Sequence, residues 1–418
     1  MMKAALTACA AQAKARMDML PEGWRETTLG KCLSIMSGYA FKSDDFCDHG
    51  VPVIRISNIT DMFDIDLSNC VYHNDMGKDF SYIAKMHDVL IAMSGATTGK
   101  IGIYKNSEIA YINQRVGKIC INDSIANLKY FFYVLNQNYI QKYILKEAIG
   151  GAQPNISNRQ ISIIKINIPP LPEQEKIAAI LSTWDKAIST TDALLATSRQ
   201  QKKALMQQLL TGKRRLPGFT GEWKTILLSD IAVRLNERNN GKSDNVVTIS
   251  AQKGLIRQEE FFNKSIASEN LDTYLILHKG QFAYNKSYSI GHPMGAIKRL
   301  KLYETGVVTS LYICFDITSR QADANFYEHC FESGLLNAAL TKIAAEGGRA
   351  HGLLNVRPAD FMHISVPLPP LDEQRAIAAV LDAADREIVL LEQKAARLRE
   401  EKKALMQQLL TGKRRVRL

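Results

Sequence analysis

The sequence predicts an α+β protein with two mixed α/β domains and a long antiparallel two-helix coiled coil that has pseudo-two-fold symmetry. Three observations lead to this prediction. The segment KKALMQQLLTGKRR occurs unchanged at 202–215 and again at 402–415. Each copy ends a stretch whose apolar residues recur at alternating spacings of three and four, which is the pattern of a coiled-coil helix. The rest of the chain consists of β-rich runs followed by one helical run in each half.

The duplication extends beyond the identical segment and divides the chain into two tandem units. Positions 170–215 and 370–415 share 26 of 46 residues. A protein built from two such units is expected to bind its target in two places. The predicted parts are an N-terminal extension at 1–20, a first variable domain at 21–169, a first helical spacer at 170–215, a second variable domain at 216–369 and a second helical spacer at 370–418.

The composition is that of a soluble protein, which we expect to be cytoplasmic. Hydrophobic residues make up 46% of the chain and charged residues 23%, which is ordinary for a globular protein. No apolar run is long enough for a membrane span. The 7 cysteines form no CxxC pair and no metal-ligand spacing, so we expect reduced core residues and no metal site. Residues 1–20 imitate a signal peptide, but Gln12 and Lys14 interrupt the apolar run, which favours a helical or frayed extension.

The net charge of +11 comes from the ends of the two repeats. Residues 199–215 hold six cations and no acid, and residues 402–417 hold six more. Without these twelve, 41 Lys and Arg remain against 42 Asp and Glu. Cations at a helix C-terminus complement the helix dipole. Two such dense basic runs also leave open a contact with phosphate or with an acidic partner.

Both repeats predict a long helix with one apolar face. Pro-Pro-Leu precedes each helix, with Glu173 or Glu373 in the opening turn, and Gly212 and Gly412 stand where a left-handed C-terminal cap belongs. The predicted seam of the coiled coil consists of Ile177, Leu181, Trp184, Ile188, Leu195, Leu205 and Leu209 in the first repeat and of Ile377, Leu381, Ile388, Leu391, Leu398, Leu405 and Leu409 in the second.

Each predicted helix needs a partner, because about 34 residues span about 51 Å, more than a domain of this size can cover. The first helix leads from the first variable domain into the second, so the second helix must run back and the pair is antiparallel. Such a pair would hold the two domains at a fixed separation. Lys202 and Lys402 fall on the seam, where a polar residue fixes register at some cost in stability. The alternative is two unrelated helices, each packed on its own domain.

The two variable domains show the same order of elements with different residues. In each domain several β-rich runs precede one stretch with helical spacing. The first domain has β-rich runs at 51–59, 88–93, 100–104 and 116–121 and a helix at 128–148, and the second has β-rich runs at 245–250, 280–285, 295–300 and 307–317 and a helix near 324–345. Two equivalent scaffolds with different surface chemistry suit a protein that reads two different targets.

At these repeats the chain resembles the specificity subunit of Type I restriction-modification enzymes. In that family each of two target-recognition domains is followed by a helix that opens with P-P-L-x-E-Q-x-x-I-A and closes near L-L-T-G-K. The matching residues are Pro170, Leu171, Glu173, Gln174, Ile177 and Ala178, and again Pro370, Leu371, Glu373, Gln374, Ile377 and Ala378. The resemblance covers nearly the whole chain, and only the N-terminal extension departs from it.

The resemblance implies a non-catalytic subunit that binds double-stranded DNA. Each variable domain would read one half of a split, asymmetric site, and the helices would measure the unread spacer. Two methylation subunits would dock on the conserved regions, followed by two restriction and translocation subunits, and these partners would perform N6-adenine methylation and ATP-dependent cleavage. S-adenosylmethionine, ATP and magnesium would therefore belong to the partners, and this chain would need no cofactor.

Catalytic motifs are absent from the sequence. The two Pro-Pro pairs follow Ile168 and Leu368, so neither forms the Asp-Pro-Pro or Asn-Pro-Pro motif with an aromatic residue that an adenine methyltransferase uses to hold a flipped base. Residues 94–100, SGATTGK, imitate a phosphate-binding loop, but Ser94 replaces the first glycine and Ile101 replaces the magnesium-ligating Ser or Thr. A small polar loop ending in lysine suits contact with the DNA backbone better.

Candidate DNA contacts are predicted loop residues whose side chains can donate hydrogen bonds to phosphates or to base edges. Arg pairs bidentately with guanine, and Asn or Gln pairs with adenine. For any one of these residues the alternative is an ordinary solvated side chain. The candidates are Lys42, Arg55, Asn58, Ser94, Thr97, Thr98, Lys100, Gln114 and Arg115 in the first domain, and Lys253, Arg257, Asn285, Lys286, Ser287, Tyr288 and Arg349 in the second.

Two other classes of function remain open from the sequence. One is a complete enzyme that methylates or cleaves DNA by itself, which the missing motifs disfavour. The other is a coiled-coil scaffold that joins proteins and does not bind DNA.

Overall fold

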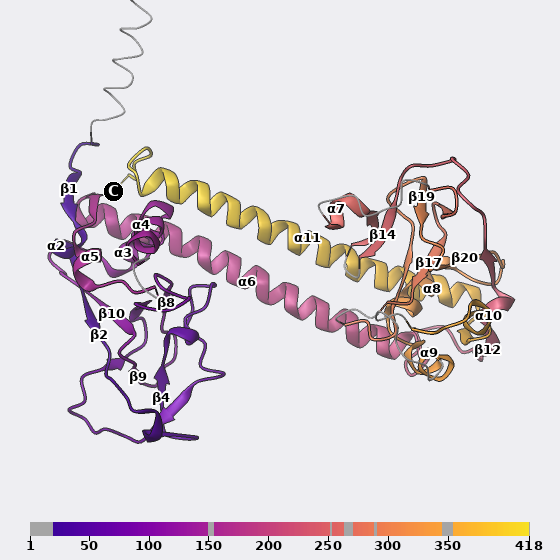
Figure 1. Ribbon diagram of the computed structural model, residues 1–418, viewed down its shortest axis with the longest axis horizontal. Helices are drawn as coiled ribbons and strands as arrows, with labels where there is room; N and C mark the ends of the chain where they lie inside the picture. The colour runs from indigo at the N-terminus through magenta and orange to yellow at the C-terminus, as the bar shows by residue number, and fades with distance from the viewer. Residues whose placement is uncertain are drawn as a thin grey trace, which may run out of the picture. The chain divides into compact units, whose positions relative to one another are not determined.

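The computed structural model of the chain describes residues 20–148, 154–250, 253–262, 271–287, 291–344 and 354–417 (Figure 1). The predicted N-terminal extension lies outside these residues except for Leu20. The chain divides into two compact units, of which unit 1 comprises residues 1–190 and 395–418 and unit 2 comprises residues 191–394. Each unit therefore holds one variable domain and a part of each of the two long helices, α6 (Leu171–Leu209) and α11 (Leu371–Leu409).

The variable domain of unit 1 contains two main sheets. Strand order is β2-β10-β7-β8 in one sheet and β3-β5-β4-β9-β6 in the other. Its strands are β1 (Arg25–Thr28), β2 (Leu33–Ser37), β3 (Phe46–Cys47), β4 (Val51–Ile54), β5 (Val71–His73), β6 (Ile83–Ala84), β7 (Val89–Ala92), β8 (Ile101–Ile103), β9 (Ala110–Ile112), β10 (Val116–Ile121) and β11 (Lys165–Ile168). Its helices are α2 (Leu29–Cys32), η1 (Ser43–Asp45), η2 (Ile56–Asn58), α3 (Leu128–Leu135), α4 (Asn138–Ala148) and α5 (Asn158–Ser162).

The variable domain of unit 2 repeats the four-stranded sheet but has no single five-stranded sheet among its described residues. Its four-stranded sheet has the order β13-β20-β17-β18, and two further ladders pair β14 with β15 and β16 with β19. Its strands are β12 (Lys224–Leu227), β13 (Ala232–Leu235), β14 (Val247–Ser250), β15 (Gly254–Arg257), β16 (Leu275–His278), β17 (Phe282–Asn285), β18 (Ala296–Arg299), β19 (Thr305–Val308), β20 (Ile313–Ile317) and β21 (Ser365–Leu368). Its helices are η3 (Leu228–Asp230), α7 (Gln258–Phe262), α8 (Ala324–Glu332), α9 (Asn337–Ile343) and α10 (Pro358–Met362).

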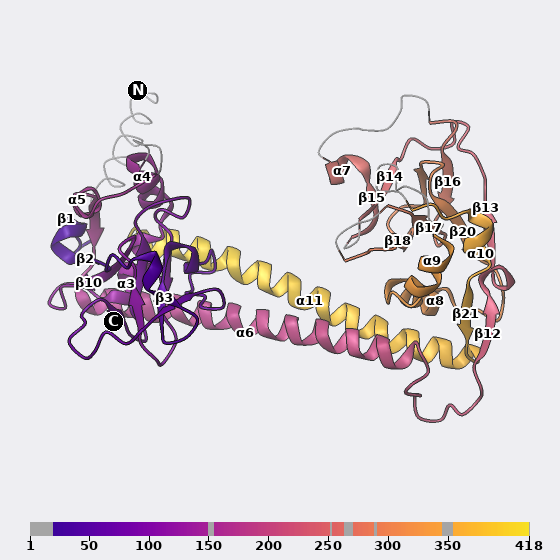
Figure 2. The same cartoon turned by 60° about the horizontal axis from the view of Figure 1, so that its bottom comes forward.

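A two-stranded ladder closes each variable domain just before its long helix. In unit 1, β1 pairs antiparallel with β11, and in unit 2, β12 pairs antiparallel with β21. Figure 2 shows β12 and β21 side by side at the start of α11. The first strand of each domain is thus fixed to the last, so the long helix begins at a defined position on the domain.

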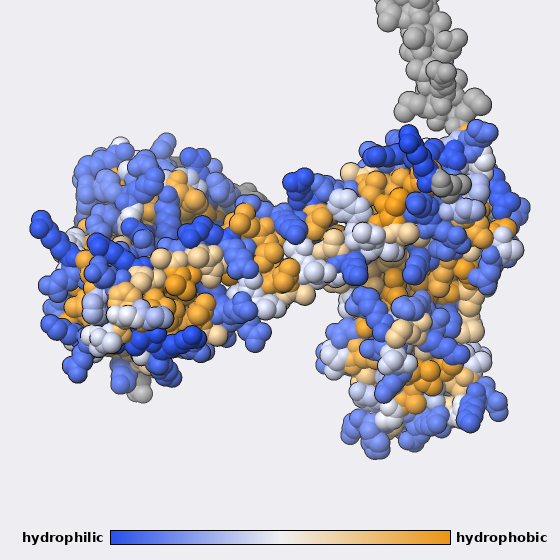
Figure 3. All heavy atoms as spheres, turned by 180° about the vertical axis from the view of Figure 1, so that it is seen from behind, coloured by the Kyte–Doolittle hydropathy of each residue, from blue (hydrophilic) through white to orange (hydrophobic). Residues whose placement is uncertain are grey.

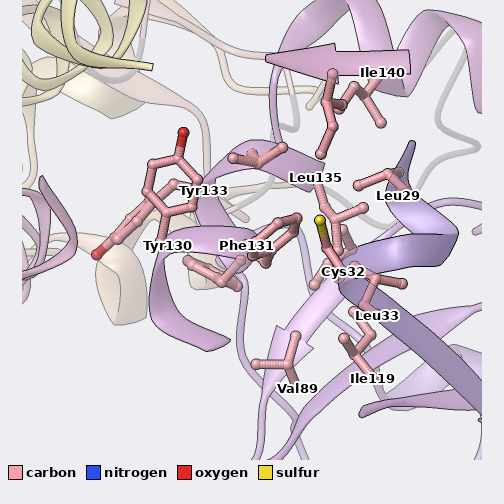
Figure 4. Close-up of a cluster of buried hydrophobic side chains, with 14 of the residues drawn as sticks. Leu29, Cys32, Leu33, Val89, Ile119, Tyr130, Phe131, Tyr133, Leu135 and Ile140 are labelled. Atoms are coloured by element: carbon pink, nitrogen blue, oxygen red, sulfur yellow. The ribbon is translucent and has the colours of Figure 1, made fainter. Parts of the chain in front are cut away.

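The core of unit 1 lies between α3 and the four-stranded sheet. Phe131 and Leu135 from α3 pack with Cys32, and Leu33, Val89 and Ile119 reach the same cluster from the sheet (Figure 4). Cys32 is unpaired and buried, as predicted, and burial raises the pKa of its thiol. The corresponding cluster of unit 2 gathers around the buried rings of α8 and β20.

The long helices pack antiparallel, which confirms the predicted pairing. In unit 1, Ile177 and Leu181 of α6 share a core cluster with Leu405 and Leu409 of α11. In unit 2, Ile377 and Leu381 of α11 share a core cluster with Leu205 and Leu209 of α6. The side chains at the predicted seam positions Ile177, Leu181, Leu209, Ile377, Leu381 and Leu409 are buried, and those at Trp184, Ile188, Leu195, Leu205, Ile388, Leu391, Leu398 and Leu405 are half-buried.

Lysines interrupt the apolar seam and form ion pairs across it. Lys402 Nζ lies 2.5 Å from Asp185 Oδ1 in unit 1, and Lys202 Nζ lies 2.5 Å from Asp385 Oδ1 in unit 2. Each lysine is 11–13% exposed, so a shift along the helix would leave a desolvated ammonium without its carboxylate. This physical cost explains how the two lysines specify register.

The start of each long helix carries a buried glutamate that holds the end of the other helix. Glu173 accepts two hydrogen bonds from the Arg415 guanidinium, at 2.8 Å each, and one from Trp24 Nε1 at 3.3 Å. Glu373 accepts the equivalent bonds from Arg215 and Trp223 in unit 2. Arg215 and Arg415, the last residues of the two identical segments, are therefore each paired inside their own unit.

The glutamine that follows each glutamate fastens the variable domain to the helix. Gln374 accepts a hydrogen bond from Asp323 N at 2.8 Å and donates to the carbonyl oxygens of Gln321 and Pro369 at 2.9 and 2.8 Å. Gln174 makes the same three kinds of bond in unit 1. Both amides are buried, and this accounts for the Glu-Gln pair in the repeated motif.

The ends of the long helices agree with the predicted caps. Gly212 and Gly412 have φ of 69° and 71°, in the left-handed region where glycine is favoured. A Cβ on Gly412 would lie 2.5 Å from Pro21 Cγ, so this glycine also permits close contact with the start of the domain.

Three predicted segments were too long. The helix predicted at 128–148 divides into α3 and α4 because Asn136 and Gln137 leave the helical path, and the Gln141 side chain donates to the freed Leu135 carbonyl at 2.8 Å. The helix predicted near 324–345 divides at Gly334, whose φ is 77°. The single β-rich run at 307–317 forms the end of β19, a turn and then β20. Within the described part of the chain, no helix combines the length and the apolar character that crossing a membrane requires.

Apolar side chains remain exposed on the long helices of unit 2. Leu194 is 50%, Val389 47% and Leu390 65% exposed. Figure 3 shows apolar residues, in orange, on the surface of the helical segment.

Replacing Gln374 by Ala is expected to lower the free energy of unfolding by about 2 to 4 kcal/mol, because it leaves buried backbone groups without partners. Gln208→Ala is the matched control, since Gln208 is exposed on α6 and its loss should change stability by less than about 0.5 kcal/mol. Equilibrium urea denaturation measures both. Equal effects of the two substitutions would contradict the role of Gln374.

Candidate nucleic-acid interface

The candidate interface of the first domain forms where two parallel strands end side by side. Val53 and Ile54 of β4 pair in parallel with Tyr111 and Ile112 of β9, and Asn113 N donates to Ile54 O at 3.0 Å. The carboxyl ends of parallel strands lie at the same edge of a sheet. Residues that directly follow the two strands, beginning with Arg55 and Asn113, are therefore brought together.

A third segment reaches the same edge because Gly38 has no side chain. Tyr39 N donates to Ile112 O, and Gln114 N donates to Tyr39 O, both at 2.8 Å. A Cβ on Gly38 would lie 2.2 Å from Ile112 O, which no side chain could accept without moving the backbone. The close approach places residues 41–43 against the strand ends.

The loop at 94–100 is the fourth segment that contacts this edge of the sheet. Thr97 Oγ1 donates to Ile56 O at 3.2 Å, and Met93 N donates to Arg115 O at 2.8 Å. The backbone N–H groups of Gly95, Thr98, Gly99 and Lys100 all donate to carbonyls of the protein. This loop therefore holds neighbouring segments in place, and most of its backbone amides are used within the protein.

These segments enclose a polar cavity of about 360 Å³. Gln114 and Arg115 are exposed at its rim, whereas Arg55 is half-buried. The Arg55 Nε atom is buried and has no hydrogen-bond partner. The cavity is lined by Phe41, Ser43, Phe46, Arg55, Ile56, Ser57, Asn113, Gln114 and Arg115.

The structure brings together four of the residues predicted from the sequence and gives internal roles to others. Arg55, Gln114 and Arg115 line the cavity, and Lys42 is an exposed neighbour of Phe41 and Ser43. The Ser94 hydroxyl is buried and has no hydrogen-bond partner.

The remaining candidates of the first domain are engaged within the protein. Asn58 is buried, accepts a bond from Arg55 N at 2.8 Å and donates to Asp66 O at 2.9 Å. Thr98 is buried and donates to Gly95 O at 2.7 Å. Lys100 forms an ion pair of 2.6 Å with the exposed Asp61. Asn58 and Thr98 thus hold the local backbone, and their side chains are not presented to a ligand.

The candidates of the second domain lie in two separate places. Lys253 and Arg257 are exposed on the β14–β15 hairpin, where the Arg257 guanidinium lies 5.5 Å from the centre of the Tyr303 ring. Asn285 is the last residue of β17, Lys286 and Ser287 follow it, and Asn285 Oδ1 accepts a bond from Ser287 N at 3.0 Å.

Lys286 is half-buried. Its ammonium donates to Val356 O at 3.4 Å, and burial lowers the pKa of this lysine. The predicted contacts Tyr288 and Arg349 lie outside the described residues.

The two domains present different residues in the equivalent turn. Between β9 and β10 the turn reads Asn-Gln-Arg at 113–115, and between β19 and β20 it reads Thr-Ser-Leu-Tyr at 309–312. The strands that carry these turns are related, since β19 also has a parallel partner at Val246. The two domains thus share a strand arrangement but present different side chains in the turn that follows it.

The comparison with known families agrees with this architecture. A family model described as the Type I restriction modification DNA specificity domain matches the chain twice, at residues 21–197 and 222–400. The chain belongs to this family. Each matched region begins near the first strand of a variable domain and continues into the long helix that follows. The proteins of the family that resemble this chain are specificity subunits, which are non-catalytic parts of Type I restriction enzymes.

Two relatives come from Methanocaldococcus jannaschii. The MjaVIII specificity subunit is 30% identical over 208 residues, which cover 49% of each chain. The putative MjaX specificity subunit is 25% identical over 434 aligned positions, which cover 96% of each chain. The chain thus spans about half of the first relative and nearly all of the second.

Solved structures share the fold. The S subunit of a Type I restriction-modification system from M. genitalium superposes with a TM-score of 0.60 at 13% identity, over 94% of this chain and 98% of that one. A chain from a structure titled for complex assembly and conformational transition of the type I R-M system superposes with a TM-score of 0.53 at 17% identity, over 94% of this chain and 99% of that one.

Sequence reasoning missed several cavity residues of this specificity subunit. Ser43, Ser57 and Asn113 line the cavity, and none of them was predicted. Asn113 directly precedes Gln114 and Arg115, so the short polar run between two β-rich runs was the available signal. Phe41 is buried, its ring stacks on that of Tyr111 with the ring centres 5.9 Å apart, and it also lines the cavity.

The described residues also contain one cluster of potential metal ligands, formed by His329, Asp382 and Asp385 within 4.8 Å of one another. Lys202 already provides a cation there, through its ion pair with Asp385. In unit 1 the equivalent position holds Tyr133, whose hydroxyl donates to Asp185 Oδ2 at 2.6 Å. Both clusters join a variable domain to the long helices.

Replacing Gly38 by Ala is expected to push residues 38–43 away from β9 and to lower the free energy of unfolding by about 3 kcal/mol. The control is Gly77→Ala, whose Cβ meets no atom within 4 Å although φ is 84°. It should cost only about 1 kcal/mol, from backbone strain. Thermal denaturation of both variants tests this, and a Gly38→Ala protein as stable as the control would contradict the described packing.

Proposed function

We propose that this specificity subunit recognises a split, asymmetric DNA site and directs the methylation and cleavage activities of partner subunits. Each variable domain reads one half of the site in double-stranded DNA. The proposal is carried by one observation. The two variable domains share an arrangement of strands, but the turns at the ends of these strands have different residues. A symmetric dimer reads two copies of one half-site, whereas two different domains on one chain suit two different half-sites.

The chemistry of the first interface suits DNA. Lys42, Arg55 and Arg115 supply positive charge, and Gln114 can both donate and accept hydrogen bonds. Such side chains bind phosphate oxygens and also distinguish base edges in the major groove. In the second domain, Lys253, Arg257, Asn285, Lys286 and Ser287 offer the same kinds of group.

The long helices set the separation of the two half-sites in this proposal. A continuous helix of 39 residues is about 58 Å long at about 1.5 Å per residue. That length corresponds to about 17 base pairs at about 3.4 Å each, which is an upper bound for the half-site separation.

The partners are two methylation subunits and two restriction and translocation subunits. The partners bind S-adenosylmethionine, ATP and magnesium and carry out N6-adenine methylation and ATP-dependent cleavage. The exposed apolar side chains of Leu194, Val389 and Leu390 offer helix surface on which a partner can dock. The complex acts on cellular DNA, which places this chain in the cytoplasm.

Deleting the gene for this chain is expected to abolish N6-methyladenine at one split motif, because partner subunits then lack their recognition domains. Single-molecule sequencing of genomic DNA from cells with and without the chain measures this. Exchanging residues 216–369 for those of a relative is expected to change one half of the motif and leave the other half intact.

The two alternative functions give different results. A complete enzyme would methylate DNA when purified alone with S-adenosylmethionine. A scaffold that does not bind DNA would leave the methylated motif unchanged after the domain exchange. Either result would contradict the proposed function.

A further inference from the structure

Arg55 has an unusual environment for an arginine. It directly follows β4, where its backbone is extended, with φ of −111° and ψ of 167°. Its side chain is half-buried in the wall of the cavity, and the Nε atom is buried without a partner. Among the residues that the structure describes, no carboxylate forms an ion pair with it. Other arginines of the chain, such as Arg415 with Glu173, bind a carboxylate bidentately.

The protein fixes the backbone of Arg55 while leaving its guanidinium without a counter-ion. Asn58 Oδ1 accepts the Arg55 N–H at 2.8 Å, and Asn58 N donates to Arg55 O at 2.9 Å. Asn58 is itself buried and held by Asp66 O. A partly desolvated cation without a partner costs free energy, so the position is explained if a ligand supplies the missing acceptors.

The surroundings indicate which acceptors fit. The rim residues Gln114 and Arg115 are exposed beside Arg55, and the Phe41 ring contributes an apolar wall. A polar cavity whose lining includes the apolar side chains of Phe41, Phe46 and Ile56 suits the edge of a base better than a phosphate alone, because a phosphate gains nothing from apolar contact. Acceptors that match the fork of an arginine are O6 and N7 of guanine.

We infer that the cavity of the first domain is a base-reading pocket and that Arg55 recognises a guanine in the half-site which that domain binds. This inference rests on the proposed function and adds the base and the residue that reads it. Gln114 and Arg115 lie at the rim, where they contact the neighbouring base pair or the backbone. The turn of the second domain that corresponds to residues 113–115 has Leu311 among its exposed residues, so the two domains differ at this part of the rim.

The test uses the complex of the full chain with its methylation subunits. The methylated motif is first determined by sequencing genomic DNA. A set of duplexes then carries this motif with each G·C pair of the first-domain half-site replaced in turn by A·T, and initial methylation rates are measured for the native complex, Arg55→Lys and Lys105→Gln. Arg55→Lys keeps the charge but loses the bidentate fork. Lys105→Gln is the control, because it removes a cation of the same domain that pairs with Asp64 outside the cavity.

The native complex is expected to prefer G·C at one position by about 5- to 150-fold. Arg55→Lys should reduce that preference to about 3-fold or less while discrimination at the other positions, including the whole second half-site, stays intact. An intact second half-site also shows that the variant is folded and assembled. The salt dependence of binding should be unchanged, since the charge is kept.

Two results would overturn the inference. If Arg55→Lys lowers the rate equally on all duplexes, Arg55 contacts phosphate and reads no base. If the variant keeps the full preference at every position, Arg55 does not act in recognition, although the proposed function stands. A native complex that methylates no specific motif would instead overturn the proposed function together with this inference.

Discussion

The buried glutamate at the start of each long helix is the interaction on which the rest of the structure depends. Glu173 and Glu373 are 1% and 0% exposed, and each collects a guanidinium and an indole N–H from segments far away in sequence. A buried carboxylate is costly unless such partners surround it. The ion pair therefore forms only when the end of one repeat lies at the start of the other, and the antiparallel arrangement of the helices follows from it.

Because this junction lies at the start of the long helix, its residues must stay constant, whereas residues elsewhere in the variable domain can differ. The helix start touches the variable domain through the Glu-Gln pair, the short ladder and one tryptophan. Residues at the opposite edge of the domain, such as Arg55 and Gln114, take no part in this junction. A turn of three or four residues can therefore change its chemistry without changing how the domain is attached, which is the property that a DNA-reading subunit requires.

Much of this architecture could be predicted from the sequence. The antiparallel helices, their glycine caps and the order of elements in the domains follow from the duplication and from local periodicity. The candidate interface was predicted only in part, because Arg55, Gln114 and Arg115 meet through a parallel strand pair and the close approach at Gly38, and neither feature has a local signal. Asn58 was predicted as a DNA contact because it is polar and near a strand end, yet it is buried and holds the backbone of Arg55.

The unchanged fourteen-residue segment follows from the contacts that it makes. In unit 2, Lys202 pairs with Asp385 and Arg215 pairs with Glu373, while Leu205 and Leu209 share a core cluster with Ile377 and Leu381. In unit 1, Lys402 pairs with Asp185 and Arg415 pairs with Glu173, while Leu405 and Leu409 share a core cluster with Ile177 and Leu181. Every partner is the same residue type in both repeats, so the same segment fits both places. The middle of each helix lacks these obligatory partners, and there the repeats differ, as at Leu194 and Lys394. Sequence identity within the chain thus marks the positions where the two repeats are physically interchangeable.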